Sequence, residues 1–376
     1  KAHTAGIKII MITGDYGLTA ESIARKIGIV DKNSRIITGA ELERLGDEEV
    51  GKAINEQDVI FARVSPEHKM RVVSVLKNKG YIVAVTGDGV NDAPALKLAD
   101  IGVAMGISGT DVAKEAAEMI LTDDNFASIV NAIEEGRAVY DNIRRFVTYI
   151  FASNIPQIIP FILFVMFDVP LPLTVLQILA IDLATDLIPA LALGAEKPEL
   201  GVMERPPRKS KERLLNSKVL LRAYGFLGPI EAAAGFGAFY FMWFQNGFTL
   251  RDIISIGKNV SIEEYSKLPV YIKATTMSLA AIVTTQIGNG FAVRSIRESI
   301  FKIGFFTNTF FLWGVLSEIV FIFIFVYVPF VNAIFGLAPI SAINWVFLFA
   351  LAPLPLIGDE IRKAIVRRYY PVAKAN

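Results

Sequence analysis

Acidic and flexible residues gather in the string GDGVNDAPAL, residues 87–96, directly after an apolar run that ends at Val85. Asp88 and Asp92 supply carboxylate oxygens, which suit Mg²⁺, an ion that takes one or two carboxylates and leaves positions for phosphate and water. The glycines let the backbone turn tightly and approach a ligand closely. The string therefore predicts a turn that can hold a divalent metal beside a phosphoryl group.

A second Thr-Gly-Asp sequence begins at Thr13 after another apolar run, and Lys69 lies between the two copies. Phosphoryl transfer is catalysed mainly by positioning and by neutralising charge, so hydroxyl, amide and ammonium groups near carboxylates fit this chemistry. An isolated Thr-Gly-Asp is usually only a turn after a strand. The repeat, the lysine and the intact ten-residue string favour a phosphoryl site, whereas His3 and His68 are given no role.

Two acids lie inside one long apolar segment, at Asp182 and Asp186. An ionisable residue in a membrane span costs roughly 2.5–3.5 kcal/mol or more, so it indicates a function by default. A spacing of four places both carboxyls on one helix face. Thr185 adds a hydroxyl, and Pro189 frees backbone carbonyls. This oxygen-rich face suits a hard cation; the alternative is that the acids only hydrogen-bond helices together.

The preceding apolar segment carries Asn154 and Gln157 on one helix face, beside two prolines that disturb the backbone. Amide oxygens can coordinate a cation without adding charge. Interhelical hydrogen bonding alone is the alternative explanation for these amides.

The elements that must position these residues differ between the two parts of the chain. Residues 1–138 alternate strand-like and helix-like segments, which predicts a parallel sheet covered by helices, with ligands beyond the carboxyl ends of the strands. The expected strands are 7–12, 59–64, 81–85, 101–104 and 119–121. The expected helices are 19–27, 68–79, 93–98 and 112–117. Both Thr-Gly-Asp sequences fall at strand ends.

Residues 139–376 are predicted to form an all-α bundle of six transmembrane helices, since crossing a bilayer core takes roughly 20 apolar residues. The spans are expected at 146–167, 171–194, 220–244, 273–293, 304–328 and 340–358. A helical pattern from 126 to 149 should join the sheet domain to the first span. The hydrophobic share of 53% agrees with a membrane protein.

Charge and cysteine content exclude several classes of protein. The chain has 38 basic and 37 acidic residues, which argues against a nucleic-acid binder, and no cysteine, which excludes disulfides and thiol chemistry. Basic residues gather in the connections 195–219 and 294–302 and in the C-terminal tail. We therefore expect a multi-pass protein, in the plasma membrane, with the sheet domain, these connections and the C-terminus in the cytoplasm.

Together these strings resemble the phosphorylation domain of P-type cation-transporting ATPases, whose catalytic core is haloacid-dehalogenase-like, and the resemblance continues through the spans. It implies ATP as the substrate and a Mg²⁺ ion bound by Asp88. The other residues implied in phosphoryl transfer are Thr13, Gly14, Asp15, Lys69, Asn91 and Asp92. Thr13 and Gly14 would donate hydrogen bonds to phosphoryl oxygens, and Lys69 would bring positive charge.

The first two spans look like the fifth and sixth spans of these pumps. They resemble the sodium/potassium pump branch most and the calcium pumps second. The ion-binding residues implied are Ser153, Asn154, Gln157, Asp182, Thr185 and Asp186, with Gln286, Asn289 and Glu318 at positions that line an extra sodium site. The sequence departs from both branches at Gln157, where they place glutamate, and from the sodium/potassium pump at Asn289, where it has aspartate. The transported cation, Na⁺, K⁺ or Ca²⁺, stays open.

The family's nucleophilic aspartate lies in an Asp-Lys-Thr-Gly-Thr string, which this sequence does not contain. The nucleotide-binding domain, the actuator domain and four spans are also missing from it. We therefore expect a C-terminal fragment of an ATP-driven cation pump that is inactive alone and works with the lipid bilayer and its missing N-terminal part. The alternatives are a membrane-anchored phosphatase, disfavoured by the buried acids, and a non-catalytic fragment that binds a partner. The loop 245–272 does not identify an accessory subunit.

Overall fold

The computed structural model describes residues 1–30, 34–56, 58–208 and 212–369, and the chain divides into two compact units. The first unit contains Lys1–Glu135 together with the described part of Gly201–Glu212. The second contains Gly136–Leu200 and the described residues from Arg213 onward. The segment from Gly201 joins the first unit because Val202 and Met203 share a small apolar cluster with Ala2, Ala5 and Val130.

The described residues of the first unit form two three-stranded parallel sheets in place of the single sheet that the sequence predicts. One has the order β1-β3-β2 and the other β4-β5-β6. The strands are β1 (Met11–Ile12), β2 (Arg35–Thr38), β3 (Val59–Ala62), β4 (Ala84–Gly87), β5 (Ile101–Met105) and β6 (Met119–Leu121). One hydrophobic core contains Phe61 of β3 and also Val83 and Val85 at β4, so the two sheets share an interior.

Six α-helices accompany these strands in the described part of the first unit, and they confirm the α/β character of this part of the chain. They are α1 (Gly17–Lys26), α2 (Gly39–Arg44), α3 (Asp47–Glu56), α4 (Pro66–Asn78), α5 (Ala93–Leu98) and α6 (Asp111–Ala116). Helix α4 starts where a capping box allows it: Ser65 Oγ accepts from the His68 amide, and His68 Nδ1 accepts from the Ser65 amide. His68 thus has a structural role that the sequence analysis did not assign.

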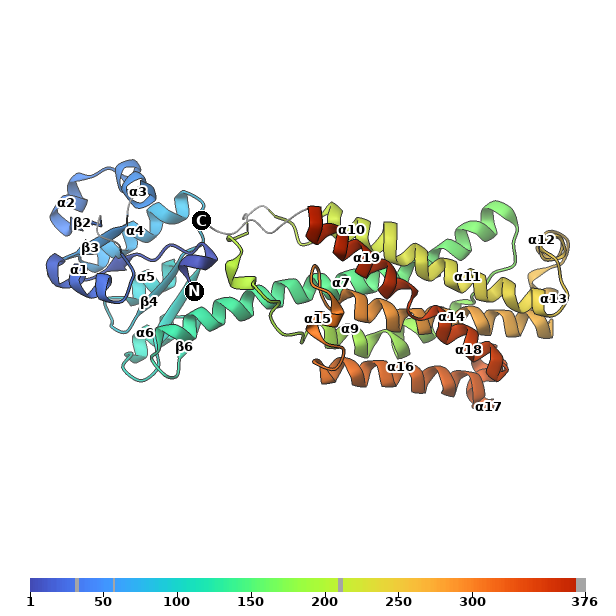
Figure 1. The fold of residues 1–376 in the computed structure, drawn as a ribbon. Helices are drawn as coiled ribbons and strands as arrows, with labels where there is room; N and C mark the ends of the chain where they lie inside the picture. Colours follow the sequence, from blue (N-terminus) through green and yellow to red (C-terminus); the bar gives the residue numbers. More distant parts are fainter. Residues whose placement is uncertain (31–33, 57, 209–211, 370–376) are drawn as a thin grey trace. The chain divides into compact units, whose positions relative to one another are not determined.

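The described residues of the second unit form helices joined by loops, with no strand among them (Figure 1). Its first helix, α7 (Phe126–Phe167), begins within the residues of the first unit and contains Pro156 and Pro160. The next helices along the chain are α8 (Val175–Ala180), a π-helical turn (Ile181–Thr185), α9 (Leu187–Leu193), α11 (Gly228–Gln245), α14 (Pro269–Val293) and α16 (Thr309–Tyr327). The other helices are α10 (Ser217–Arg222), α12 (Leu250–Asn259), α13 (Ile262–Tyr265), α15 (Ile300–Ile303), α17 (Pro329–Phe335), α18 (Ala342–Leu351) and α19 (Leu354–Tyr369).

Among the described residues, three helical segments are long and apolar enough to cross a membrane: Phe126–Phe167, Thr309–Tyr327 and Ala342–Tyr369. A fourth is a bent pair, Val175–Thr185 with Leu187–Leu193, at 41°. Helices α11 and α14 overlap the two remaining predicted spans, but they are less apolar than the segments named above. The composition of α14 explains this, because a helix buried along most of its length can carry polar residues. A membrane domain is therefore supported, and the number of six spans stays a prediction.

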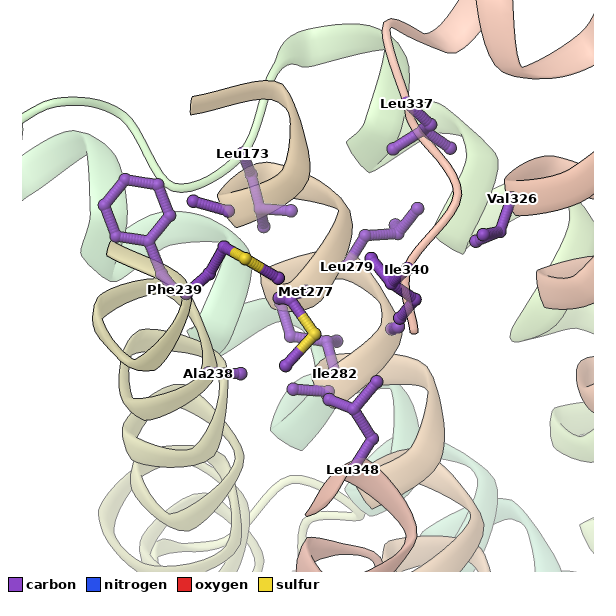
Figure 2. Packing of buried hydrophobic residues seen from close by; sticks show 14 of the residues in the cluster. Leu173, Ala238, Phe239, Met277, Leu279, Ile282, Val326, Leu337, Ile340 and Leu348 are labelled. Atoms are coloured by element: carbon purple, nitrogen blue, oxygen red, sulfur yellow. The ribbon is translucent and has the colours of Figure 1, made fainter. Parts of the chain in front are cut away.

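Helix α14 lies at the centre of the second unit. Its Met277, Leu279 and Ile282 pack among side chains of α11 and α18 in the largest apolar cluster (Figure 2). Close approach requires glycine at Gly288, because a Cβ there would lie 1.9 Å from the carbonyl oxygen of Ala352. This packing holds the polar residues of α14 in fixed positions against α11.

Ion pairs reinforce one end of this helical unit. Arg294, fully buried after α14, binds the Glu196 carboxylate at 2.7 Å, and Asn308 donates to the other Glu196 oxygen at 2.7 Å. Arg222 similarly binds Asp359 of α19 at 2.8 Å. Removing one partner of such a buried pair usually costs about 3–5 kcal/mol, so these contacts fix the connections between helices.

Candidate functional site

Asp92 holds together the turn that the sequence singles out. Its Oδ1 accepts from Lys69 Nζ at 2.6 Å, which ties α4 to the start of α5. Its Oδ2 accepts from the backbone amides of Gly89 at 3.1 Å and Asp88 at 3.3 Å. Because both carboxylate oxygens are used within the protein, Asp92 shapes the turn and orients Lys69. Gly87 is required here, since a Cβ would lie 2.4 Å from that of Asp92.

Asp88 differs from Asp92 in that its side chain is exposed and makes no hydrogen bond or ion pair within the described residues. Its backbone carbonyl accepts from the Thr110 amide at 2.8 Å, which fixes the residue from the other side. A fixed backbone with a free carboxylate fits a Mg²⁺ ligand, because this ion is usually held by one or two carboxylates with phosphate and water completing its shell. Asn91 is also exposed, beside the same turn.

The Thr13 turn follows β1 and is fastened to the end of β3. The Thr13 amide donates to the Phe61 carbonyl at 2.8 Å, and the Arg63 amide donates to the Asp15 carbonyl at 3.1 Å. Thr13 Oγ1 accepts from the Asp15 amide at 3.1 Å, while Gly14 and the Asp15 side chain are exposed. The structure thus joins Lys69, Asp88 and Asp92 through direct contacts, and it places Thr13, Gly14 and Asp15 in a separate exposed turn.

Asp124 supports the loop beside Asp88, a role that the sequence analysis missed. Its carboxylate accepts from the amides of Gly106, Ile107 and Ser108 at 2.6, 2.9 and 2.7 Å. These hydrogen bonds, the one from Ile107 foremost, lower the pKa of Asp124 from 3.8 to about 2. The loop they hold leads into Thr110, which binds the Asp88 carbonyl. The second acid of a Thr-Asp-Asp-Asn turn gives no sequence signal for this contact.

Replacing Asp124 with asparagine should loosen this loop. Since the pKa is lowered in the folded state, the stabilisation is present above pH 3.8 and is lost as the pH falls toward 2. The variant should abolish that pH dependence and speed hydrogen exchange at the amides of Ile107 and Ser108. Asparagine tolerates the left-handed backbone of this residue, where φ is 49°, so the change isolates the charge. Glu115→Gln, an exposed acid on α6, is the control; equal protection in all three proteins would contradict the assignment.

The second unit places both membrane acids against α7. Ser153 Oγ donates to Asp186 Oδ2 at 2.5 Å, and Gln157 Nε2 donates to Asp182 Oδ1 at 2.8 Å. Gln157 lies four residues after Ser153 on α7, whereas its partner Asp182 lies four residues before Asp186. Two helices that run antiparallel pair in this order. Ser153, Gln157 and Asp186 are buried, whereas Asp182 is exposed. Asn154 is half-buried and takes no part in these bonds.

A break in the helix surrounds the buried acid. Residues Ile181–Thr185 form a π-helical turn, in which the Asp186 amide donates to the Ile181 carbonyl at 3.0 Å. Thr185 Oγ1 donates to that same carbonyl at 2.9 Å. Pro189 has no amide hydrogen, so the Thr185 carbonyl has no α-helical donor. Such π-turns are frequent at functional sites, and this one separates Asp182 from Asp186 in burial although the two are close in sequence.

More buried polar side chains surround Ser153 and Asp186. Gln286 Nε2 of α14 donates to Ser153 Oγ at 3.2 Å, and Tyr149 of α7 donates to Glu318 Oε1 of α16 at 3.0 Å. Asn289 and Glu318 are almost fully buried, as is Gln286. The structure thus gathers Ser153, Asp186 and Gln286 in one hydrogen-bonded chain, with Glu318 bound separately through Tyr149.

Comparisons with known proteins match both units. A family model described as "Cation transporting ATPase, C-terminus" matches residues 170–365. Models described as "haloacid dehalogenase-like hydrolase" match residues 1–100 and 71–133.

Curated proteins with similar sequences cover nearly the whole chain. It is 38% identical over 411 residues to a sodium/potassium-transporting ATPase subunit alpha-2 from Pongo abelii and 37% identical to that of Homo sapiens. It is also 37% identical over 408 residues to the subunit alpha-3 from Rattus norvegicus. Each alignment covers 98% of this chain but 40% of the relative, so the chain spans well under half the length of the proteins it matches.

Proposed function

This chain belongs to the cation-transporting ATPase family, and we propose that it forms the C-terminal portion of an ATP-driven cation pump. The observation that carries the proposal is the pairing of Asp186 with Ser153 and of Asp182 with Gln157 inside the apolar helical unit. A membrane anchor alone has no need of acids held in place by hydroxyl and amide partners. The predicted family resemblance and the haloacid-dehalogenase-like first domain are confirmed by the family matches.

The first unit would contribute part of a phosphoryl-transfer site. Lys69, oriented by Asp92, offers positive charge to a phosphoryl group, and the backbone amide of the exposed Gly14 offers a hydrogen bond. Asp88 would hold Mg²⁺, which when bound neutralises charge on the transferred phosphoryl group. The nucleophile would come from the part of the longer protein that this sequence does not include. ATP as the phosphoryl donor follows from the family.

The second unit would bind Na⁺ or K⁺ near the break at Asp186. Gln157 and Asn289 contribute amide oxygens without charge, so the site has fewer negative ligands than one built from carboxylates alone. Affinity for a divalent ion depends strongly on the number of charged ligands. A low charge therefore favours a monovalent cation, and Ca²⁺ is the alternative.

The orientation in the membrane is inferred from the basic residues in the connections 195–219 and 294–302 and in the C-terminal tail. We place the first unit and the C-terminal tail in the cytoplasm, with six helices in the plasma membrane. The missing N-terminal part of the longer protein would complete both sites. Helix α7, which contributes Ser153 and Gln157, is the element through which a change at the phosphoryl site would reach the cations.

The test is cation-dependent phosphorylation of the full-length protein by radiolabelled ATP. Acid-stable phosphoenzyme should form with Mg²⁺ and should depend on NaCl or KCl, with choline chloride as the control and CaCl₂ as the competing hypothesis. A membrane-anchored phosphatase would instead show no dependence on the cation. Absence of any phosphoenzyme would favour the non-catalytic alternative.

A further inference from the structure

The imidazole of His68 closes the turn that begins α4, one residue before Lys69. Its Nδ1 accepts from the Ser65 amide at 3.1 Å, and the His68 amide donates to Ser65 Oγ at 3.4 Å. A capping box usually has glutamate or glutamine at this position. The acceptor here is instead a side chain of the type that changes its charge between pH 5 and 8.

The ring is held in one orientation between α2 and α4. The His68 side chain is 15% exposed, and its Nε2 lies 3.3 Å from Glu43 Oε1 of α2. Gly39 of the same helix allows this approach, because a Cβ there would lie 3.1 Å from Nδ1 of the ring. Since Nδ1 accepts a hydrogen bond, the neutral ring carries its proton on Nε2, toward Glu43.

Protonation of the ring would remove this cap. A protonated Nδ1 is a donor and cannot accept from the Ser65 amide. The N-terminal end of a helix also disfavours a positive charge. Two acids face the ring: Glu43, and Glu67 of α4, whose pKa is lowered mainly by its hydrogen bond to Ser65 and to a smaller degree by His68. Both acids are exposed, so water weakens their compensation of the new charge.

Loosening of this turn would reach Lys69 directly. The Lys69 amide donates to the Ser65 carbonyl at 3.2 Å, so the Ser65 backbone anchors both the imidazole and the lysine. The Lys69 ammonium in turn pairs with Asp92 at 2.6 Å. The next turn of α4 is fastened independently, because Arg71 Nε donates to Asp47 at 2.9 Å. The effect of the proton is therefore confined to the first turn.

We propose that His68 is a positioning residue for Lys69 and makes phosphoenzyme formation sensitive to protons. The neutral ring holds the turn that orients Lys69, and the protonated ring releases that turn. This inference deepens the proposed pump function and rests on it, since Lys69 is assigned to the phosphoryl group there.

The experiment measures the rate of phosphoenzyme formation in the full-length protein at about pH 7.5 and about pH 5.5, on either side of histidine titration. Glutamine keeps an acceptor for the Ser65 amide but does not titrate, so His68→Gln should keep the wild-type rate at the higher pH. On acidification the wild type should slow about fivefold more than His68→Gln, the effect expected from the loss of one helix cap.

Two further variants separate the cap from other effects of acid. His68→Ala lacks the acceptor and should be slow at the higher pH as well. His3→Gln changes the other histidine of this sequence, an exposed residue, and should follow the wild type at both pH values. An equal decline of the rate in the wild type and in His68→Gln would overturn the proposal.

Hydrogen exchange of the same full-length proteins gives a measurement that does not depend on activity. After correction for the intrinsic effect of pH, the amides of Ser65 and Lys69 should lose protection on acidification in the wild type and keep it in His68→Gln. A loosened turn without a change in rate would refute the link to Lys69. If the wild type forms no phosphoenzyme at either pH, the pump function itself fails, whereas the exchange data still test the cap.

Discussion

Replacing Asp186 with asparagine in the full-length protein is expected to abolish cation-stimulated phosphorylation. Asparagine keeps the size of the side chain and an oxygen for the Ser153 hydroxyl, which lies at 2.5 Å, but it removes the negative charge. Because Asp186 is buried beside a free backbone carbonyl at the helix break, no solvent is at hand to replace that charge. We expect the cation concentration for half-maximal phosphorylation to rise at least about 100-fold, equivalent to about 2.7 kcal/mol.

The controls for this variant separate cation binding from folding. Asp252→Asn changes an exposed acid in the N-terminal turn of α12, outside the candidate site, and should leave the cation dependence unchanged. Asp186→Asn should remain able to form phosphoenzyme from inorganic phosphate, since the first unit is intact. If phosphorylation of Asp186→Asn depends on the cation as strongly as that of the wild type, Asp186 does not bind the cation. Its hydrogen bond to Ser153 then only holds two helices together.

Much of the fold could be predicted from sequence because its elements have strong local signals. Helix α5 and strand β6 lie at the predicted residues 93–98 and 119–121, and α4 starts two residues earlier than expected, at Pro66. Strand β2 and helices α2 and α3 were missed, since residues 34–56 form short elements among many charged side chains. The division into two sheets follows from tertiary packing, which sequence periodicity does not encode.

The candidate cation site was only partly predictable. The acids in an apolar run identified Asp182 and Asp186 as candidates, and in the structure each contacts a side chain of α7. The π-helical turn, however, leaves Asp182 exposed and Asp186 buried, and no property of the string IDLATD indicates this difference. Glu231 is a lone acid in an Ala- and Gly-rich helix, and its complete burial is evident only in the structure.

Asp88→Asn in the full-length protein should reduce the rate of phosphoenzyme formation by at least about 100-fold, as does the loss of other groups that stabilise charge in a transition state. The reason is geometric: Asp92 is saturated by Lys69 and two amides, so it cannot replace Asp88 as a metal ligand without breaking its own contacts. Raising the Mg²⁺ concentration should restore part of the rate, because the lesion is in metal binding.

The matched control for Asp88 is Asp111→Asn, an exposed acid at the start of α6 that makes no part of the turn. Lys69→Met would give a different result, since it removes positive charge and also frees Asp92; its defect should not respond to Mg²⁺. A full rate for Asp88→Asn at low Mg²⁺ would contradict the magnesium role. The defects of Asp88→Asn and Lys69→Met can be told apart because the ion pair with Lys69 keeps Asp92 in the turn. Asp88 is then the carboxylate whose two oxygens are available to bind Mg²⁺.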